Sequence, residues 1–327
     1  MKFSCGLAPA QDSPELASLA ESLGYERVWL YDSPALHADV WMTLARVAEK
    51  TTRIGLGPGV LVPSLRHVMA DAAAIATLEA LAPHRVAVTV GTGFTGRILL
   101  GERPMPWAEV VTYLKALRGL LRGEQTEVEG AVLQMLHPVD YVAARPIEIP
   151  LIVAANGPTG LRVARELGDG VMSVMEPQPG FAWSIVAGGG TVLDQGEDPG
   201  SARAAAAAGP HITMLYHYFY EVPGVSRQVD DLPGGTEWRA EVDAIPERVR
   251  HLQLHETHML DISDRDRQLV SGDSLQAFTW TGTAEQVKTR IAALEAGGAT
   301  ELFYEPAGPD IPREMATFAK VAGLEPR

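Results

Sequence analysis

The fold is decided by residues 53–93, RIGLGPGVLVPSLRHVMADAAAIATLEALAPHRVAVTVGTG. This stretch holds two short hydrophobic runs, at residues 53–62 and 84–93, on either side of a helix-length segment at residues 67–82. Both runs are apolar almost throughout, which is typical of parallel strands that are buried on both faces. The stretch therefore predicts a β–α–β unit in a parallel sheet.

The same alternation of short apolar runs and helix-length segments continues on both sides of this stretch. Strands are expected at residues 2–8, 27–32, 150–155, 169–174, 211–221 and 301–306, with a β-hairpin at 126–136. Helices are expected at residues 13–24, 39–49, 107–123, 160–168, 236–260, 284–298 and 311–323. Counting the pairs gives about eight β/α units, and that number predicts an α/β fold of the (β/α)8 TIM-barrel type. A doubly wound sheet is the main alternative, but no G-x-G-x-x-G motif follows the first expected strand.

The chain contains no clear linker, so residues 1–327 are expected to form a single TIM-barrel domain. Two segments, residues 176–210 and 223–276, are predicted to be irregular or helical insertions near the barrel mouth. In a barrel of this type, functional residues lie where the strands end and the following loops begin. The strand ends are therefore the first places to look for a site.

The composition excludes several kinds of partner. Of all residues 46% are hydrophobic, and 41 acidic residues outnumber 27 basic ones, which gives a net charge of −14. Because there is no basic run or stripe, nucleic acid is not an expected partner. No stretch approaches the roughly 20 apolar residues that cross a bilayer, and no secretory signal is visible, so no membrane partner is expected. The single cysteine, Cys5, fits a reducing compartment and favours a cytoplasmic location.

Two strand ends carry groups that are suited to a ligand. The run at residues 27–32 ends in Asp32, and Ser33 and His37 follow it. The run at residues 150–155 enters a helix through Asn156, Gly157, Pro158, Thr159 and Gly160. Exposed N–H groups, a hydroxyl and the positive end of a helix dipole suit a phosphate there. The alternative is a simple tight turn with proline at the first helical position.

Four blocks of the chain, in their order and spacing, resemble the bacterial luciferase-like family. That family comprises TIM-barrel flavin monooxygenases and oxidoreductases that use the deazaflavin F420. The matching blocks are residues 18–34, 41–81, 85–93 and 151–173, so the resemblance extends over nearly the whole chain.

The resemblance implies a flavin-like ring system lying across the carboxyl-terminal mouth of the barrel. In relatives that use F420, the third strand carries a cis non-proline peptide behind the ring, which corresponds here to Gly59-Val60, although an ordinary trans bulge is the alternative. Asp32 matches the acidic residue near the polar edge of the ring. The other cofactor contacts that the resemblance implies are Thr92, Gly93 and the phosphate turn Asn156, Gly157, Pro158, Thr159 and Gly160.

Departures from the family pattern narrow the expected chemistry. The F420-dependent sugar-phosphate dehydrogenases of the family place a catalytic histidine and a glutamate where this chain has Ser33 and Phe94, so that proton relay is not expected. His37 either replaces the missing acid or faces solvent. The FMN-using luciferases carry an arginine near the position of Thr92, and its absence favours F420 over FMN. Arg97 lies a few residues on, and it weakens this inference because it can reach an anionic tail.

Histidines are the remaining candidates for proton transfer. His217 is expected on the strand at 211–221, while HLQLHETHML, residues 251–260, places His251, His255 and His258 on one face of a helix. The sequence His255-Glu256-Thr257-His258 is one residue too short for the H-E-x-x-H zinc motif, and three ligands on one helix converge poorly. No metal is therefore expected.

Two interpretations of the segment at 251–260 stay open. It is either an ordinary amphipathic helix or a helix over the barrel mouth that delivers His258 to the substrate. His217, His258 and His37 are the predicted catalytic residues, and Trp280, Tyr304 and Glu305 are weaker candidates.

These features predict an oxidoreductase that transfers hydride between F420 and a small-molecule substrate. An FMNH2-dependent monooxygenase is the first alternative, in which the pocket protects a flavin peroxide from water. A cofactor-free binding or partner subunit is the second. The family resemblance also implies a homodimer.

Overall fold

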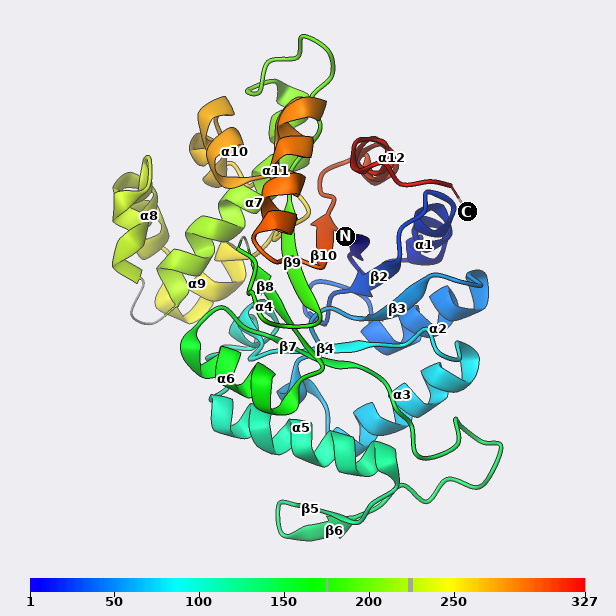
Figure 1. Cartoon of the computed structure of the whole chain (residues 1–327). Coiled ribbons are helices and arrows are strands. Elements are labelled where there is room, and N and C mark those ends of the chain that lie inside the picture. The colour runs from blue at the N-terminus through cyan, green and yellow to red at the C-terminus, as the bar shows by residue number, and fades with distance from the viewer. Residues whose placement is uncertain (175, 223–225, 327) are drawn as a thin grey trace. The chain divides into compact units, whose positions relative to one another are not determined.

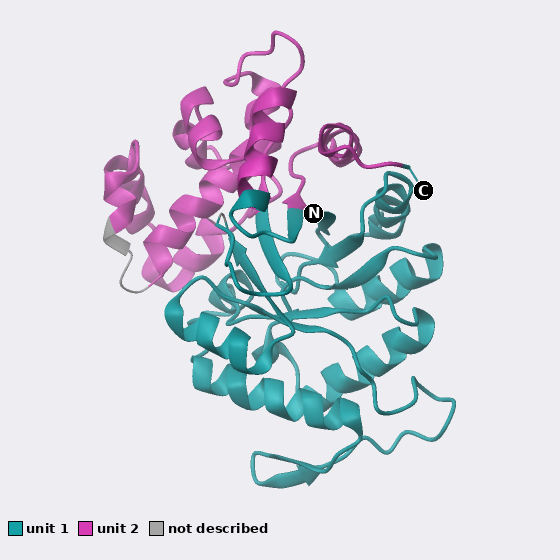
Figure 2. Cartoon of the chain, in the orientation of Figure 1, with its two compact units in different colours: residues 1–187, 295–303, 326–327 teal, residues 188–294, 304–325 magenta. Residues whose placement is uncertain are grey.

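The computed structural model describes residues 1–174, 176–222 and 226–326. The chain divides into two compact units, which Figure 2 shows in different colours. Unit 1 contains residues 1–187, 295–303 and 326–327, and unit 2 contains residues 188–294 and 304–325. The prediction of a single domain with two insertions near the barrel mouth stays a prediction.

In the described residues, eight strands form one sheet in the order β3-β2-β1-β10-β9-β8-β7-β4 (Figure 1). Their bounds are β1 Lys2–Leu7, β2 Arg27–Leu30, β3 Gly55–Pro58, β4 Val88–Val90, β7 Leu151–Ala154, β8 Gly170–Val174, β9 Ser184–Gly189 and β10 Glu301–Glu305. The outermost strands of this order, β3 and β4, meet through parallel bridges from Leu56 to Val86 and from Leu61 to Val90. The predicted (β/α)8 TIM barrel is therefore confirmed, because these bridges close the sheet on itself.

The helices of unit 1 follow the strands as the sequence predicts. Their bounds are α1 Ser13–Ser22, α2 Val40–Lys50, the 3-10 turn η1 Pro63–Leu65, α3 Val68–Leu81, α4 Phe94–Ile98, α5 Trp107–Arg122 and α6 Pro158–Leu167. Neighbouring pairs α1–α2, α2–α3, α3–α5 and α5–α6 pack against one another, so these helices follow one another around the strands of unit 1. The predicted hairpin is also present, with strands β5 Thr126–Val128 and β6 Ala131–Leu133 paired antiparallel.

The interior of the barrel is filled by side chains. Its core cluster within unit 1 contains Trp29, Ala87, Ile152, Met172, Ile185, Ala187 and Phe303. Glu301, which is fully buried, accepts hydrogen bonds from the indole nitrogens of Trp29 at 3.2 Å and Trp183 at 2.9 Å. Because the interior is packed, a ligand has room only at the ends of the strands, and in this fold it binds at the carboxyl ends.

Unit 2 is mainly helical. Its elements are α7 Ala202–Glu221, η2 Ser226–Asp231, α8 Gly235–Asp243, α9 Glu247–Leu254, η3 Asp266–Leu269, α10 Gly272–Phe278, most of α11 Ala284–Ala296, and α12 Ile311–Ala322. Its core forms around α7, where Ile212 and Tyr216 pack with Trp238 of α8.

Three sequence predictions about this part of the chain are wrong. Residues 211–221 are helical, because they continue α7, which begins with a Ser201 cap that accepts from the Ala204 N–H and with an alanine-rich run. The strand that takes the place of 211–221 in the sheet is β9, which lies in the segment at 176–210 that was expected to be irregular or helical. The helix predicted at 236–260 is two helices, and the second ends at Leu254.

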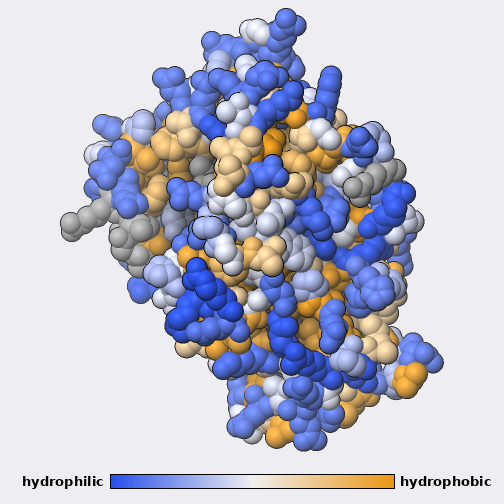
Figure 3. All heavy atoms as spheres, viewed as in Figure 1, coloured by the Kyte–Doolittle hydropathy of each residue, from blue (hydrophilic) through white to orange (hydrophobic). Residues whose placement is uncertain are grey.

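The face drawn in Figure 3 mixes hydrophilic residues with groups of hydrophobic ones. Among the described helices, none has the combination of length and apolar character that spanning a bilayer requires.

Candidate functional site

Asp32, directly after β2, is held by an arginine that the sequence did not single out. The carboxylate is buried and accepts two hydrogen bonds from Arg66, at 2.8 and 2.9 Å, and one from the Val62 N–H at 3.1 Å. Arg66 also donates to Asp39 at 3.2 Å. Burial opposes the charge of Arg66, but the hydrogen bonds and charge of Asp32 outweigh it and raise the pKa of the guanidinium. A buried carboxylate at a strand end needs a cation, and that need is the signal that could have identified Arg66.

The ends of β3, β4 and β7 meet at small side chains. The Gly59-Val60 peptide is cis, as the family resemblance implied. A Cβ atom added to Gly91, just after β4, would lie 2.8 Å from Val60 Cγ1 and 3.3 Å from the Cβ of Ala154 in β7. Val60 and Ala154 are half-buried and pack on the barrel core. We call the group of Val60, Gly91 and Ala154 the mouth shelf, in which Val60 and Ala154 are partly exposed and Gly91 is buried.

The predicted contacts after β4 differ in what they can offer a ligand. Gly93 has a φ of +78°, a left-handed conformation that favours glycine, and it precedes α4. Thr92 is half-buried, and its carbonyl accepts from the Met105 N–H at 2.8 Å. Arg97 pairs with Glu102 at 2.9 Å and donates from Nε to the Arg103 carbonyl at 2.6 Å. The guanidinium of Arg97 is thus held by residues 102 and 103, which follow α4.

The predicted phosphate turn leads from β7 into α6. Gly157 is the N-cap of α6, and no side chain caps the helix. Residues 156–159 are exposed, and a Cβ atom added to Gly157 would meet no atom within 4 Å. Pro158 carries no N–H, so the N–H groups of the exposed residues Gly157 and Thr159 are the ones that an anion could reach.

Two members of this turn serve the fold. The Asn156 Oδ1 accepts from the Val174 N–H at 2.8 Å, which ties the end of β7 to the end of β8. A Cβ atom at Gly160 would lie 2.3 Å from Trp107 Cζ2, so only glycine allows α6 to pack closely there. The exposed residues Gly157 to Thr159 are the part of the turn that remains for a ligand.

His37 lies in the same unit as these residues. It is half-buried, its backbone N–H donates to the Ser33 carbonyl at 3.0 Å, and its ring centroid is 6.0 Å from that of Tyr31. Burial lowers the pKa of the imidazole, so His37 is neutral at pH 7 and can accept a proton. His37 is therefore not purely solvent-facing, and its role in proton transfer stays a prediction.

The other predicted histidines form a buried cluster in unit 2. His217 of α7, His255 and His258 are 2%, 0% and 7% exposed. The Nδ1 atoms of His255 and His258 are 3.0 Å apart. The predicted helical face is wrong, because α9 ends before His255, and His217 takes the third place in the cluster that His251 was expected to fill. We call His217, His255 and His258 the histidine cluster.

Of the weaker candidates, Trp280 and Tyr304 are core residues, and Glu305 is a polar residue at a strand end. Tyr304 stacks on Phe318 at 3.9 Å, and Trp280 stacks on the same ring at 6.2 Å, so both aromatic residues belong to the core. Glu305, at the carboxyl end of β10, is half-buried, and burial raises its pKa to about 7. His211, which the sequence analysis did not select, is buried, and burial lowers its pKa to about 4.

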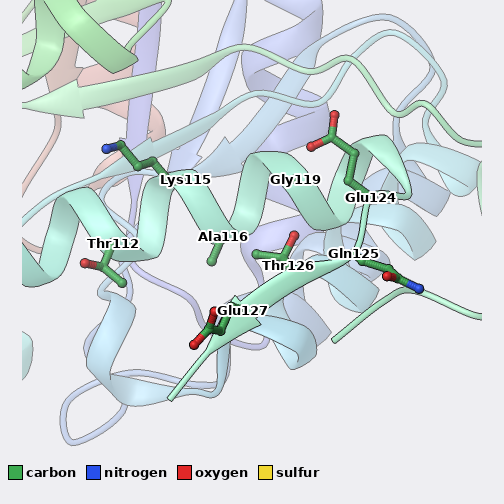
Figure 4. Close-up of a pocket in the computed structure, with 8 residues that line it drawn as sticks. All are labelled: Thr112, Lys115, Ala116, Gly119, Glu124, Gln125, Thr126 and Glu127. Carbon is green, nitrogen blue, oxygen red and sulfur yellow. The ribbon is translucent and has the colours of Figure 1, made fainter. Parts of the chain in front are cut away.

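A surface hollow lies away from these residues. It has a volume of about 410 Å³ and is lined by Thr112, Lys115, Ala116, Gly119, Glu124, Gln125, Thr126 and Glu127 (Figure 4). It lies between α5 and β5, at the surface of unit 1. Its lining contains no residue that was predicted to bind the cofactor.

Comparisons with known proteins identify similar chains. The family described as luciferase-like monooxygenase matches residues 6–301. The chain is 28% identical to a 5,10-methylenetetrahydromethanopterin reductase from Methanolobus tindarius over 196 residues, which cover 59% of each protein. It is 33% identical to an F420-dependent glucose-6-phosphate dehydrogenase from Beutenbergia cavernae over 174 residues, 46% of this chain and 49% of the relative. The alignments therefore span about half to three-fifths of these relatives' own lengths.

A solved structure shows the same fold over almost the whole chain. It is described as an F420-dependent secondary alcohol dehydrogenase in complex with an F420–acetone adduct. The TM-score is 0.69 with 19% identity, and the match covers 98% of both chains.

Proposed function

Since the chain belongs to the luciferase-like monooxygenase family, we propose that it is an oxidoreductase that transfers hydride between coenzyme F420 and a small organic substrate. The observation that carries this proposal is the mouth shelf, where Val60, Gly91 and Ala154 meet at the ends of three barrel strands. A flat ring can lie on such a surface, since small side chains let it approach the backbone closely. When bound, F420 supplies the hydride chemistry itself.

The phosphate turn supports the same cofactor. Its exposed N–H groups at the start of α6 suit an anionic tail, and the open space around Gly157 leaves room for one. The protein's part is to hold the ring on the shelf and the tail on the turn, which fixes the orientation of the reacting atoms.

Two observations favour F420 over FMN. Thr92 stands where the FMN-using relatives have an arginine, and the nearby Arg97 is held by Glu102 and the Arg103 carbonyl. In addition, the similar glucose-6-phosphate dehydrogenase and the solved alcohol dehydrogenase are both described as F420-dependent.

We assign the polar edge of the ring to the Asp32–Arg66 pair and proton transfer to His37. Arg66 offers a fixed positive charge next to Asp32, with 17% of its side chain exposed. His37 follows the same strand end and is neutral at pH 7, so it can take a proton from a substrate hydroxyl as hydride leaves the carbon. His217 and His258 remain candidates for this role, but their burial against each other favours a different one.

The proposal extends to the assembly and the cellular location. The family resemblance supports a homodimer, and the single cysteine supports a cytoplasmic enzyme.

Separate fluorescence titrations with F420 and FMN test the proposed function. Micromolar or tighter binding of F420 with much weaker binding of FMN is expected. Tight FMN binding without F420 binding would support the monooxygenase alternative, and binding of neither would support a cofactor-free partner subunit.

A further inference from the structure

The histidine cluster is built from two separate segments of unit 2. His217 lies on α7, whereas His255 and His258 lie in the turns that follow α9. The ring centroids are 5.0 Å apart for His217 and His255, 4.9 Å for His255 and His258, and 6.1 Å for His217 and His258. Three imidazoles therefore converge where almost no solvent reaches.

The distances between ring nitrogens fit a tetrahedral cation. One nitrogen from each histidine can be chosen so that all three lie within 4.8 Å of one another, and the Nδ1 atoms of His255 and His258 are 3.0 Å apart. Zinc–nitrogen bonds of about 2.0–2.1 Å at tetrahedral angles place two ligand nitrogens about 3.3 Å apart. The Nδ1 atoms of His255 and His258, at 3.0 Å, lie close to this spacing, and a nitrogen of His217 lies within 4.8 Å of the other ligand atoms.

His217 is the member that most needs a partner. It is 2% exposed, and within the described residues its Nδ1 has no hydrogen bond, while its Nε2 has only the Asp266 carboxylate, at 3.4 Å. Buried polar atoms are nearly always satisfied by protein, water or an ion. A cation between the three rings would accept the lone pair of this imidazole.

Carboxylates lie on the other side of two of the rings. Glu221, one turn after His217 on α7, is 2.6 Å from the Nε2 atom of His255. Asp266 Oδ2 is 3.4 Å from the Nε2 atom of His217. In metal sites, a carboxylate on the far nitrogen fixes the tautomer so that the near nitrogen offers its lone pair to the ion. The two negative charges would also balance a divalent cation.

We propose that His217, His255 and His258 bind a zinc-class divalent cation through three imidazole nitrogens. Three nitrogen ligands suit zinc, cobalt or nickel rather than magnesium or calcium, which prefer oxygen. Three protein ligands leave the fourth tetrahedral position for water or another oxygen ligand. The site joins α7 to the turns after α9, and it does not depend on which cofactor the barrel binds.

Cobalt binding to the metal-free full-length chain tests the site. The protein is purified with a tag that contains no histidine, stripped with a chelator and titrated with Co²⁺. We expect one equivalent per chain to bind with the visible absorption of a four-coordinate ion, and equimolar Zn²⁺ to abolish that absorption. A wild-type protein that shows no such absorption at micromolar concentrations would overturn the proposal and leave a hydrogen-bonded histidine cluster only.

Variants separate this site from adventitious binding. His255→Ala should weaken Co²⁺ binding at least 100-fold, and Glu221→Gln, which keeps all three ligands, should weaken it about 10- to 100-fold. His251→Ala is the matched control, because His251 is close in sequence but outside the cluster, and it should bind like the wild type. Circular dichroism checks that each variant is folded. Equal affinity in the wild type and a folded His255→Ala protein would overturn the proposal, as would an equal loss in His251→Ala.

Discussion

Asp32 and Arg66 form a two-pronged ion pair at the barrel mouth, in which both carboxylate oxygens accept from the guanidinium at 2.8 and 2.9 Å. The pair joins the end of β2 to the segment between β3 and α3. Because Asp32 is buried, its charge depends on Arg66 for compensation. The pair therefore holds the mouth in shape before any ligand arrives.

Replacing Arg66 with methionine should destabilise the protein by about 3 kcal/mol, since an uncompensated carboxylate stays buried. Urea unfolding measures the loss. Asp32→Asn combined with Arg66→Met should recover part of it, because the amide carries no charge. If the double variant is no more stable than Arg66→Met alone, the pair does not compensate a buried charge.

The two glycines that flank the proposed cofactor position differ in their surroundings. At Gly91 an added Cβ atom would lie 2.8 Å from Val60 Cγ1, whereas at Gly157 it would meet nothing within 4 Å. Gly91→Ala should therefore cost about 1–3 kcal/mol by overpacking, and it should weaken F420 binding by disturbing the mouth shelf. Gly157→Ala is the matched control for stability only, and it should leave the free energy of unfolding nearly unchanged. Equal unfolding midpoints for the two variants, together with a wild-type F420 affinity of Gly91→Ala, would contradict the shelf.

A charge at the phosphate turn should repel the cofactor. Gly157→Asp places a carboxylate at the start of α6, and we expect F420 affinity in a fluorescence titration to fall at least tenfold. Ala202→Asp adds the same charge at the start of α7 and should leave the affinity unchanged. An unchanged affinity in Gly157→Asp would show that the tail does not bind this turn.

The sequence predicted most strands of the barrel, because each depends on a local pattern of apolar residues. The runs at residues 53–62 and 84–93 are apolar almost throughout, so their burial in a parallel sheet can be predicted from each run alone, and the barrel follows from the repetition of such runs. The run at residues 211–221 is rich in aromatic residues and resembles a strand, but the alanine-rich segment before it carries the helix through.

The site was less predictable because its parts depend on tertiary pairing. Arg66 lies 34 residues after its partner Asp32, and no periodic pattern connects them. His217 lies on α7, whereas His255 lies in the turns after α9, so the spacings within HLQLHETHML could not identify His217 as the third histidine of the cluster. The proposed phosphate turn could be selected from the sequence because Gly157, Pro158 and Gly160 lie within four residues, and its ligand stays a prediction.

Glu305 should make stability depend on pH in a definite direction. Burial raises its pKa to about 7, from about 4.3 in an unfolded chain. Between these values the folded state keeps a proton that the unfolded state has lost, so the contribution of Glu305 to stability is complete below pH 4 and declines as the pH rises through 7.

Glu305→Gln should remove this decline, because the amide stays neutral. The variant should match the wild type near pH 4.5 and be about 1–2 kcal/mol more stable at pH 8, a figure reduced from the full shift because the residue keeps some exposure to solvent. Urea unfolding of both proteins from pH 4.5 to 8 measures the difference, in which all other titrating groups cancel. A stability difference that stays constant over this range would mean that Glu305 ionises normally in the folded protein.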